Sequence, residues 1–497
     1  MLSAIAAPRS APTTTGREFP KRPDVKTLQS GIPFGGPCGI VMRAVLVRTY
    51  VGSPRANMKV TLIHWSRGDR EFHPGVAALS AILKRHGHEV KVIVDDNTMT
   101  PESYKEHIDS WKPDLFGFSC MSFQWAPVSD RAHWVKAANG HLPVIVGGYH
   151  PTALPEMVLK HPCIDFVCQG EGDLALVELC DRMQSGGDLK TIANIWYKER
   201  AAGGDVIHRN PLRPLIDDLD TLPDWDREAF DMDRLLQDVG KLALVWGNEI
   251  MPVYAGRGCP YACTFCANSS WLMMYRGKGR FTRKRSVRNV IDELKRLKDR
   301  YRIKRFEFWD EMFCLGTGWL EEFCKAYAEE VGLPWTAFVR AETCTITNLR
   351  MMKAANCQIL AMGVEAGNEE YRRQHLKKRT TDRIIIEAFD NCREVGIETV
   401  ASNIIGLPYE TPDLVRDTIA LNRRLDPHAL YFFHFTPLPG TELYDVCAKE
   451  GYLAENQDFW YESADTMIHQ PSLTEDDLDR VWREFRELQR EIEKKYE

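Results

Sequence analysis

The sequence predicts an α/β protein in two halves: a doubly wound parallel sheet, followed by a partial (β/α)6 barrel of the TIM type. Strand-like and helix-like patterns alternate through residues 58–200 and again through residues 247–452, which is the order expected of parallel sheets. A proline-punctuated, acidic stretch at 211–223 separates the two runs. A chain of 497 residues is also too long for one ordinary domain.

The first half is expected to form a flavodoxin-like or Rossmann-like sheet. Its strands are predicted at 60–64, 89–94, 115–119, 143–146 and, as the last strand, 165–168. Helical periodicity predicts helices at 76–86, 101–111, 127–139 and 174–183. Ligands of such sheets bind beyond the carboxyl ends of the strands. The loops at 65–75, 120–125, 147–152 and 169–173 are therefore candidates for a binding site.

The second half repeats the alternation of strands and helices. Strands are predicted at 253–255, 306–309, 334–338, 359–363, 398–405 and 429–435. Helices are predicted at 287–300, 319–330, 348–355, 381–395 and 412–424. Six repeats are too few for an eight-stranded barrel, so we expect an open partial barrel with its site at the carboxyl ends of the strands.

The flanking segments have weaker signals. Residues 1–57 are basic and rich in Pro, Gly, Ser and Thr, and we expect a disordered extension, with an organelle transit peptide as the alternative. Residues 201–246 are expected to be a linker, and residues 453–497 a helical tail with an amphipathic helix from 472. Ser472 and Glu475 have the spacing of a capping box at the start of that helix.

The composition excludes several classes of protein. A hydrophobic content of 44% is too high for wholesale disorder, and a net charge of -6 gives no reason to expect nucleic acid as a partner. No apolar stretch approaches the ~20 residues that span a bilayer. Fourteen cysteines without the spacing of a disulfide framework indicate a reducing compartment, so we expect a cytoplasmic protein.

The most informative feature is a set of three cysteines, Cys259-x-x-x-Cys263-x-x-Cys266, directly after a predicted strand. Three thiolates on one tight loop can ligate three corners of a cubic iron–sulfur cluster. A fourth cysteine at a matching interval is absent, so one iron would stay open to another ligand. The alternatives are a structural zinc site, which requires four protein ligands, and buried cysteines without a metal.

This loop, with Phe265 as its aromatic residue, resembles that of the radical S-adenosylmethionine (SAM) enzymes. The resemblance implies a [4Fe–4S] cluster whose open iron is chelated by the amino and carboxylate groups of SAM. It also implies reductive cleavage of SAM to methionine and a 5′-deoxyadenosyl radical. The cofactor carries this chemistry, and the protein positions it.

The same resemblance assigns SAM contacts to matching positions in the later strands. An acidic pair after the second strand matches the motif that binds the SAM amino group, and an arginine after the third matches the partner of the SAM carboxylate. Positions after the fourth and fifth strands match those near the ribose and adenine. These residues are Asp310, Glu311, Arg340, Glu365, Asn403, Gly406 and Pro408.

The first half resembles the cobalamin-binding domain that precedes many radical SAM domains. The resemblance rests on four stretches, 72–79, 117–122, 147–152 and 169–173. The implied cobalamin contacts are Ser119, Ser122, Gly147, Gly148, His150, Thr152, Gly170, Glu171 and Gly172. The Asp-x-His-x-x-Gly motif that supplies a lower cobalt ligand in other cobalamin domains is absent, so His73 is expected to be a loop residue.

A basic stretch at 276–285 follows the cysteine loop. We expect its cations to be solvated loop charges. The alternative is that they receive a phosphate or carboxylate of the substrate or cofactor.

Together these features predict a cobalamin-dependent radical SAM enzyme, foremost a methyltransferase that acts on an unactivated carbon. The alternatives are an oxidative cyclase or rearrangement enzyme with the same cofactors, as in the anaerobic route to the isocyclic ring of chlorophylls, and a cobalamin sensor without catalysis. The expected partners are a small-molecule or lipid-like substrate and an electron donor such as flavodoxin or ferredoxin. The sequence assigns no catalytic side chain and no particular substrate.

Overall fold

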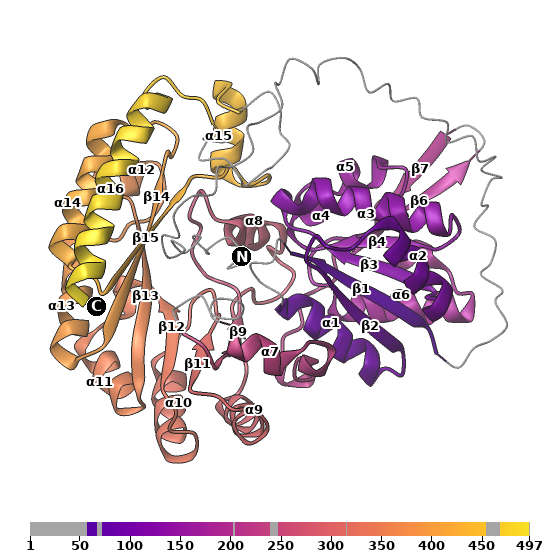
Figure 1. Ribbon diagram of the computed structural model, residues 1–497, viewed down its shortest axis with the longest axis horizontal. Helices are drawn as coiled ribbons and strands as arrows, with labels where there is room; N and C mark the ends of the chain where they lie inside the picture. Colours follow the sequence, from indigo (N-terminus) through magenta and orange to yellow (C-terminus); the bar gives the residue numbers. More distant parts are fainter. Residues whose placement is uncertain are drawn as a thin grey trace, which may run out of the picture.

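The computed structural model describes residues 57–66, 72–201, 204–238, 247–314, 316–453 and 468–496. Residues 1–56, which make up nearly all of the expected N-terminal extension, lie outside the described residues. Figure 1 shows two α/β units side by side, the first in indigo and purple and the second in orange and yellow. Helix α8 (Ala267–Met274) lies between them. No helix of the described residues is long and apolar enough to cross a membrane.

The first unit is built on a seven-stranded sheet with the strand order β2-β1-β3-β4-β5-β6-β7. Strands β1 to β5 pair in parallel, whereas β6 pairs antiparallel with both β5 and β7. The strands are β1 (Lys59–Trp65), β2 (Glu89–Asp95), β3 (Leu115–Ser119), β4 (Val144–Gly147), β5 (Phe166–Cys168), β6 (Ile195–Ala201) and β7 (Gly204–His208). The prediction that the strand ending at Cys168 is the last one was wrong, because an antiparallel hairpin extends the sheet.

Helices cover both faces of this sheet, as the alternation of its buried side chains requires. Val60 and Leu62 of β1 belong to the core under α1 and α6, whereas Ile63 and Trp65 belong to a separate core under α2, α3 and α5. The helices are α1 (Pro74–Arg85), α2 (Pro101–Trp111), α3 (Trp125–Ala138), α4 (Tyr149–Ala153), α5 (Pro155–Lys160) and α6 (Asp173–Ser185).

The second unit is a six-stranded parallel sheet with the order β15-β14-β13-β12-β11-β8. Its strands are β8 (Ile250–Val253), β11 (Arg305–Phe308), β12 (Trp335–Val339), β13 (Cys357–Glu365), β14 (Glu398–Ile405) and β15 (Ala429–His434). Among the described residues the terminal strands β8 and β15 do not pair with each other, so the barrel is open. The helices that follow its strands are α9 (Val287–Arg300), α10 (Thr317–Glu330), α11 (Ile346–Ala354), α12 (Glu369–Gln374), α13 (Asp382–Val395), α14 (Pro412–Leu425) and α15 (Glu442–Glu450).

The last helix, α16 (Glu475–Tyr496), packs against β15 and α14 on the outside of the barrel. The Trp482 ring stacks on His434 at 3.9 Å, and Phe485 contacts Phe432 at 4.5 Å between ring centroids. The capping box is two residues later than predicted: Thr474 Oγ1 accepts a bond from the Asp477 backbone N–H, and Asp477 Oδ2 accepts from the Thr474 backbone N–H. The helix begins at Glu475, which makes Thr474, and not Ser472, the N-cap residue.

The segment between the two units packs on both of them. It contains the helix α7 (Met232–Gln237), and Asp226 accepts bonds from Ser80 and Lys84 of α1. On the other side Arg227 forms a buried ion pair with Glu293 of α9 at 2.8 Å. This part of the predicted linker therefore ties the two units together.

Candidate functional site

The three cysteines of the motif lie on the loop between β9 (Gly256–Arg257) and α8. Cys263 is buried, and Cys259 and Cys266 are half-buried. The loop is tied to a neighbouring turn, because Thr264 donates its backbone N–H to Leu376 O at 3.2 Å and its hydroxyl to His375 O at 2.7 Å. The cysteines are therefore held at the carboxyl edge of the barrel sheet.

The environment of these thiols suits a polynuclear metal group. Burial, followed by the neighbouring Cys263, raises the pKa of Cys266 to about 12, and burial also raises the pKa of Cys259. Thiolates at such positions need a cationic partner. A cluster of several irons is held by thiolates spread around a body larger than a single ion.

The two acidic residues after β11 have different surroundings. Asp310 is buried and fully engaged, since its carboxylate accepts bonds from the Ala255 backbone N–H at 2.8 Å and from Lys284 Nζ at 2.7 Å. Glu311 accepts a bond from the Gly258 backbone N–H at 3.1 Å and also lines a cavity. Burial raises the pKa of Glu311. Of the two predicted contacts for an ammonium group, Glu311 is the one that faces open space.

Arg340 lies against the cysteine loop. Its guanidinium is bound by Glu342 at 2.7 Å and by Thr380 at 3.0 Å. Its other terminal nitrogen is 3.6 Å from Cys263 Sγ, and the group stacks over the Tyr261 ring at 3.8 Å. The sequence analysis missed these partners, and the position of Arg340 as a carboxylate ligand stays a prediction.

Glu365 ends β13 in a left-handed backbone conformation, with φ of 70°. Such strain is uncommon for a side chain of this kind and clusters at functional sites. Its carboxylate is held by Lys378, whose Nζ is 3.1 Å away and also donates to the Gly363 carbonyl. Lys378 is a partner of Glu365 that the sequence analysis missed, because it lies thirteen positions later in a loop without any motif.

The predicted contacts of the fifth strand are bonded within the protein. Asn403 is buried, and its amide exchanges bonds with Asn422 at 2.8 and 3.2 Å. The backbone N–H of Gly406 donates to Glu410 Oε2 at 2.7 Å, and Pro408 O accepts from the Tyr371 hydroxyl at 2.8 Å. As SAM contacts these residues stay predictions; the structure assigns them to the support of the turn.

Phe265 of the cysteine loop is partly buried. It packs against the small apolar core that contains Leu376, Leu407 and Phe435. This contact fixes the carboxyl end of the cysteine loop.

A cavity of about 420 Å³ lies between the two units. From the first unit it is lined by six of the nine predicted cobalamin contacts, namely Ser119, Gly147, Gly148, Gly170, Glu171 and Gly172. From the second unit it is lined by Gly256, Arg257, Gly258, Trp309 and Glu311. The binding edges that were predicted separately for the two sheets therefore line the same cavity.

The other three predicted cobalamin contacts, Ser122, His150 and Thr152, do not line this cavity. Ser122 Oγ is 3.2 Å from His150 Nδ1, behind the loop that follows β4. The Thr152 hydroxyl donates to Gly148 O at 2.7 Å and accepts from the Gly170 backbone N–H at 3.0 Å. Thr152 therefore positions the two glycine loops.

Comparison with known families identifies both units. Residues 65–180 match the B12-binding domain, and residues 253–421 match the radical SAM superfamily. The chain is a radical SAM enzyme with a B12-binding domain. These two domains imply cobalamin, a [4Fe–4S] cluster and SAM as its cofactors.

Relatives of this radical SAM enzyme support the same assignment. An uncharacterized methyltransferase of Pyrococcus horikoshii is 29% identical over 414 residues, 82% of this chain and 85% of that protein. An anaerobic magnesium-protoporphyrin IX monomethyl ester cyclase of Rubrivivax gelatinosus is 27% identical over 83% of this chain and 72% of its own. The solved structure of the radical SAM methyltransferase TsrM from Kitasatospora setae, with cobalamin and a [4Fe–4S] cluster bound, has the same fold, with a TM-score of 0.63, 18% identity, and coverage of 79% of this chain and 78% of that one.

In the structure His73 is the N-cap residue of α1 in the B12-binding domain and lines the cavity, and the expectation that it is not a cobalt ligand stays a prediction. Its Nδ1 accepts the Val76 backbone N–H at 3.1 Å at the start of α1, so the neutral ring carries its proton on Nε2. Nε2 lies 3.2 Å from Ser119 Oγ. Both ring nitrogens are therefore engaged. His64, which the sequence analysis did not consider, lies beside it at 4.5 Å between ring centroids and also lines the cavity.

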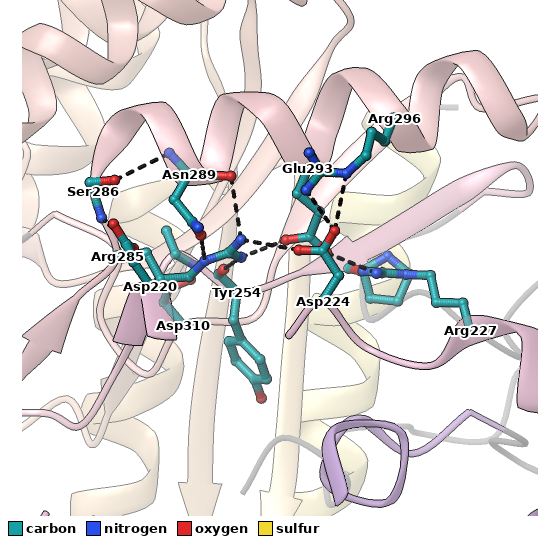
Figure 2. A network of polar contacts seen from close by, with 12 residues as sticks. Asp220, Asp224, Arg227, Tyr254, Arg285, Ser286, Asn289, Glu293, Arg296 and Asp310 are labelled. Atoms are coloured by element: carbon teal, nitrogen blue, oxygen red, sulfur yellow. Dashed lines mark hydrogen bonds and ion pairs between the residues drawn. The ribbon is translucent and has the colours of Figure 1, made fainter. Parts of the chain in front are cut away.

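The end of the basic stretch is not solvated as predicted. Arg285 donates to Asn289 Oδ1 at 2.6 Å and to Glu293 Oε2 at 2.5 Å, and Asp224 is 3.6 Å away, as Figure 2 shows. Arg283 and Lys284 are also buried or nearly so and form ion pairs. The prediction failed because the acidic partners come from other segments of the chain, which the local sequence does not reveal.

Proposed function

We propose that this radical SAM enzyme is a methyltransferase that transfers a methyl group to an unactivated carbon of a small-molecule or lipid-like substrate. The observation that carries the proposal is the single cavity shared by the glycine loops of the B12-binding domain and the Gly256–Gly258 edge of the radical SAM domain. A shared cavity lets two cofactors act on one substrate without diffusion between sites.

The residues present fit the cofactors that the domains imply. The thiols of Cys259, Cys263 and Cys266 would hold the cluster and leave one iron for SAM. When bound, the cluster and SAM supply a carbon-centred radical, and cobalamin supplies the methyl group. In this proposal Glu311 would accept bonds from an ammonium group, and Glu365, which Lys378 holds, would accept bonds from hydroxyls.

The character of the cavity wall supports an apolar substrate. The segment between the domains contributes Leu222 and Trp225, and the barrel contributes Tyr254 and Trp309. Trp225 and Tyr254 pack edge to face at 5.0 Å between ring centroids. Such walls exclude water, which would quench a reactive intermediate. They also favour an apolar surface on the molecule that binds there.

We also propose a one-electron donor such as flavodoxin or ferredoxin, and a reducing setting such as the cytoplasm. A [4Fe–4S] cluster of this kind has to be reduced before SAM is cleaved, and the described side chains supply no electron source. The thirteen cysteines of the described residues are all free thiols, which is the state that a reducing compartment maintains.

Oxidative cyclisation is the second candidate, because the cyclase of Rubrivivax gelatinosus matches over most of the chain. The products of SAM separate the two reactions. A methyltransferase of this type uses SAM both as the methyl source and as the radical source, so it releases S-adenosylhomocysteine and 5′-deoxyadenosine. A cyclase releases 5′-deoxyadenosine without stoichiometric S-adenosylhomocysteine.

The test is anaerobic incubation of the reconstituted protein with hydroxocobalamin, SAM and a strong reductant, followed by chromatography of both products. We expect both products, with S-adenosylhomocysteine dependent on added cobalamin. Deoxyadenosine alone, in the presence of reduced cobalamin, would favour cyclisation. Absence of both products would contradict the proposal.

A further inference from the structure

Two arginines flank the cysteine loop on a short ribbon of the radical SAM domain. Arg257 of β9 and Arg283 of β10 (Arg283–Lys284) are directly opposite each other in the antiparallel pair. Like charges directly opposite on neighbouring strands repel each other. This arrangement therefore requires opposite charges close by, and within the described residues they come from the other domain.

The partners are two carboxylates of one loop in the B12-binding domain. Asp173 binds Arg257 through both oxygens, at 2.9 and 3.0 Å. Glu171 likewise binds Arg283 through both oxygens, at 2.5 and 3.2 Å. Paired, two-point contacts of this kind fix orientation as well as distance. The Arg283 guanidinium is therefore not left open to bind an anionic substrate in the way that the alternative account of the basic stretch supposed.

Because these charges are largely buried, each one depends on its partner for stabilisation. The side chain of Arg283 is 2% exposed and that of Asp173 is 8% exposed. Burial by itself would raise the pKa of Asp173, but the charge of Arg257 outweighs it and holds the pKa below its ordinary value. When one partner of a buried ion pair is removed, the other is left as an uncompensated charge. The pairs are therefore a geometric constraint on both domains.

A third contact comes from the end of helix α8. The Tyr275 hydroxyl accepts the Glu171 backbone N–H at 2.9 Å. Gly170, with φ of 81°, lies so close that a Cβ atom there would be 1.9 Å from the Tyr275 oxygen. Three elements around the cysteine loop, namely β9, β10 and the end of α8, thus hold residues 170–173 of the other domain, which are the end of the β5–α6 loop and the first residue of α6.

This loop is the one that carries three of the predicted cobalamin contacts, Gly170, Glu171 and Gly172, and it lines the shared cavity. Arg257 is two residues before Cys259 in the chain. We propose that the pairs Arg257–Asp173 and Arg283–Glu171 form an interdomain clamp that sets the position of bound cobalamin relative to SAM. The inference rests on the proposed role of the loop in cobalamin binding. In this role the four residues are positioning residues, and their effect is on the step that needs both cofactors.

Two activities of the same protein separate this role from a general structural one. Reductive cleavage of SAM to 5′-deoxyadenosine needs only the radical SAM domain. Cobalamin-dependent formation of S-adenosylhomocysteine needs SAM and cobalamin in register across the interface. A misplacement of about 1 Å costs on the order of a hundredfold in rate. The clamp therefore predicts loss of the second activity and retention of the first.

The experiment compares wild type with Arg257→Gln, Asp173→Asn, the double variant and the conservative Arg257→Lys. Arg288→Gln is the matched control, since Arg288 forms an exposed ion pair with Glu330 within one domain. Iron content, the dissociation constant of hydroxocobalamin and first-turnover rates of both SAM products are measured on anaerobically reconstituted protein.

We expect iron content and deoxyadenosine formation within about twofold of wild type in all variants, because Thr264 and Arg340 anchor the cysteine loop independently. S-adenosylhomocysteine formation should fall about ten- to a hundredfold in each single variant, with a smaller rise in the cobalamin dissociation constant. The double variant should form S-adenosylhomocysteine no more slowly than the slower of the two single variants, because both substitutions break the same pair. Arg257→Lys should recover part of the loss, and Arg288→Gln should match wild type.

Three outcomes would overturn the clamp while leaving the proposed function intact: variants equal to wild type in both products, a parallel fall of both products, or losses that multiply in the double variant. If wild type itself forms no S-adenosylhomocysteine and binds no cobalamin, the proposed function fails and the clamp fails with it.

Discussion

The two edges of the cavity differ in kind. The barrel side presents side-chain chemistry: the Glu311 carboxylate lines the cavity, and the thiols of Cys259, Cys263 and Cys266 and the Glu365 carboxylate lie outside its lining. The edge of the first sheet presents mainly shape, because Gly147, Gly148, Gly170 and Gly172 line the cavity and leave room for a large ligand. The role of the barrel edge depends on which side-chain atoms are present. The role of the glycine edge depends on how closely a ligand can approach the backbone. The two edges should therefore respond differently to substitution.

The largest difference should come from the cysteine loop. Replacing all three cysteines by alanine should reduce the iron content from about four per chain to nearly none, because these thiols are the proposed ligands of the cluster. Iron analysis and visible absorbance of anaerobically purified protein measure this. Cys180→Ala, which removes a buried cysteine of the B12-binding domain, is the control and should keep its iron. Iron that persists in the triple variant would show that another site holds it.

Side-chain chemistry at the barrel edge can also be weakened without loss of the cluster. Glu365→Gln should raise the SAM dissociation constant roughly ten- to a hundredfold, since one charge-assisted hydrogen bond contributes about 1.5–3 kcal/mol. Iron content should change little, because Glu365 is not one of the proposed cluster ligands. Glu370→Gln, at an exposed position of the following helix, is the matched control. Unaltered SAM binding in Glu365→Gln would remove this position from the site.

At the edge of the first sheet, cobalamin binding should depend more on access to the backbone of the glycines than on any side chain. Gly148 has φ of 102°, and a Cβ there would lie 2.8 Å from Cys120 O, whereas Gly204, with φ of 119°, has open space around it. Gly148→Ala should weaken cobalamin binding and lower the free energy of unfolding by about 1–3 kcal/mol. Gly204→Ala shares the unfavourable φ without the clash. Equal effects of the two substitutions on cobalamin binding would show that close approach at Gly148 is unimportant.

The last expected effect is on the pH dependence of stability and concerns the support beneath the barrel edge. Burial raises the pKa of Glu410 to about 8, so the folded protein retains a proton there that the unfolded chain loses near pH 4.5. Its stabilising contribution is complete below pH 4.5 and declines as the pH rises toward 8, by up to about 1.4 kcal/mol per pH unit. Glu410→Gln should flatten this part of the pH–stability profile, measured by denaturant unfolding between pH 5 and 8. Identical slopes in wild type and variant would assign the proton elsewhere.

The same contrast explains what the sequence could predict. The spacing of three cysteines and the period-2 and period-3.6 patterns are local, so the cluster loop, the two α/β units and most of their strands followed from them. The contacts of Lys378, Glu342 and Glu410 did not, because each depends on a side-chain pairing that the spacing of residues along the chain does not reveal. The antiparallel strands β6 and β7 were missed for a related reason: a polar hairpin at a sheet edge has weak hydrophobic periodicity.

Charge was the least predictable property. The local sequence predicts that Arg283 and Arg285 are solvated cations. In the structure they pair with acidic residues of the other domain and of the intervening segment. Their burial depends on pairing across sequence separations such as the 112 residues between Glu171 and Arg283. No local pattern carries that information.

The central claim is that cobalamin and the [4Fe–4S] cluster serve one cavity. Electron paramagnetic resonance of the fully loaded protein, poised so that cob(II)alamin and the reduced cluster coexist, tests it most directly. Two paramagnetic centres at the edges of one cavity of this size should interact, so their signals should be broadened or split relative to protein loaded with either cofactor alone. A spectrum equal to the simple sum of the two separate spectra would contradict the account.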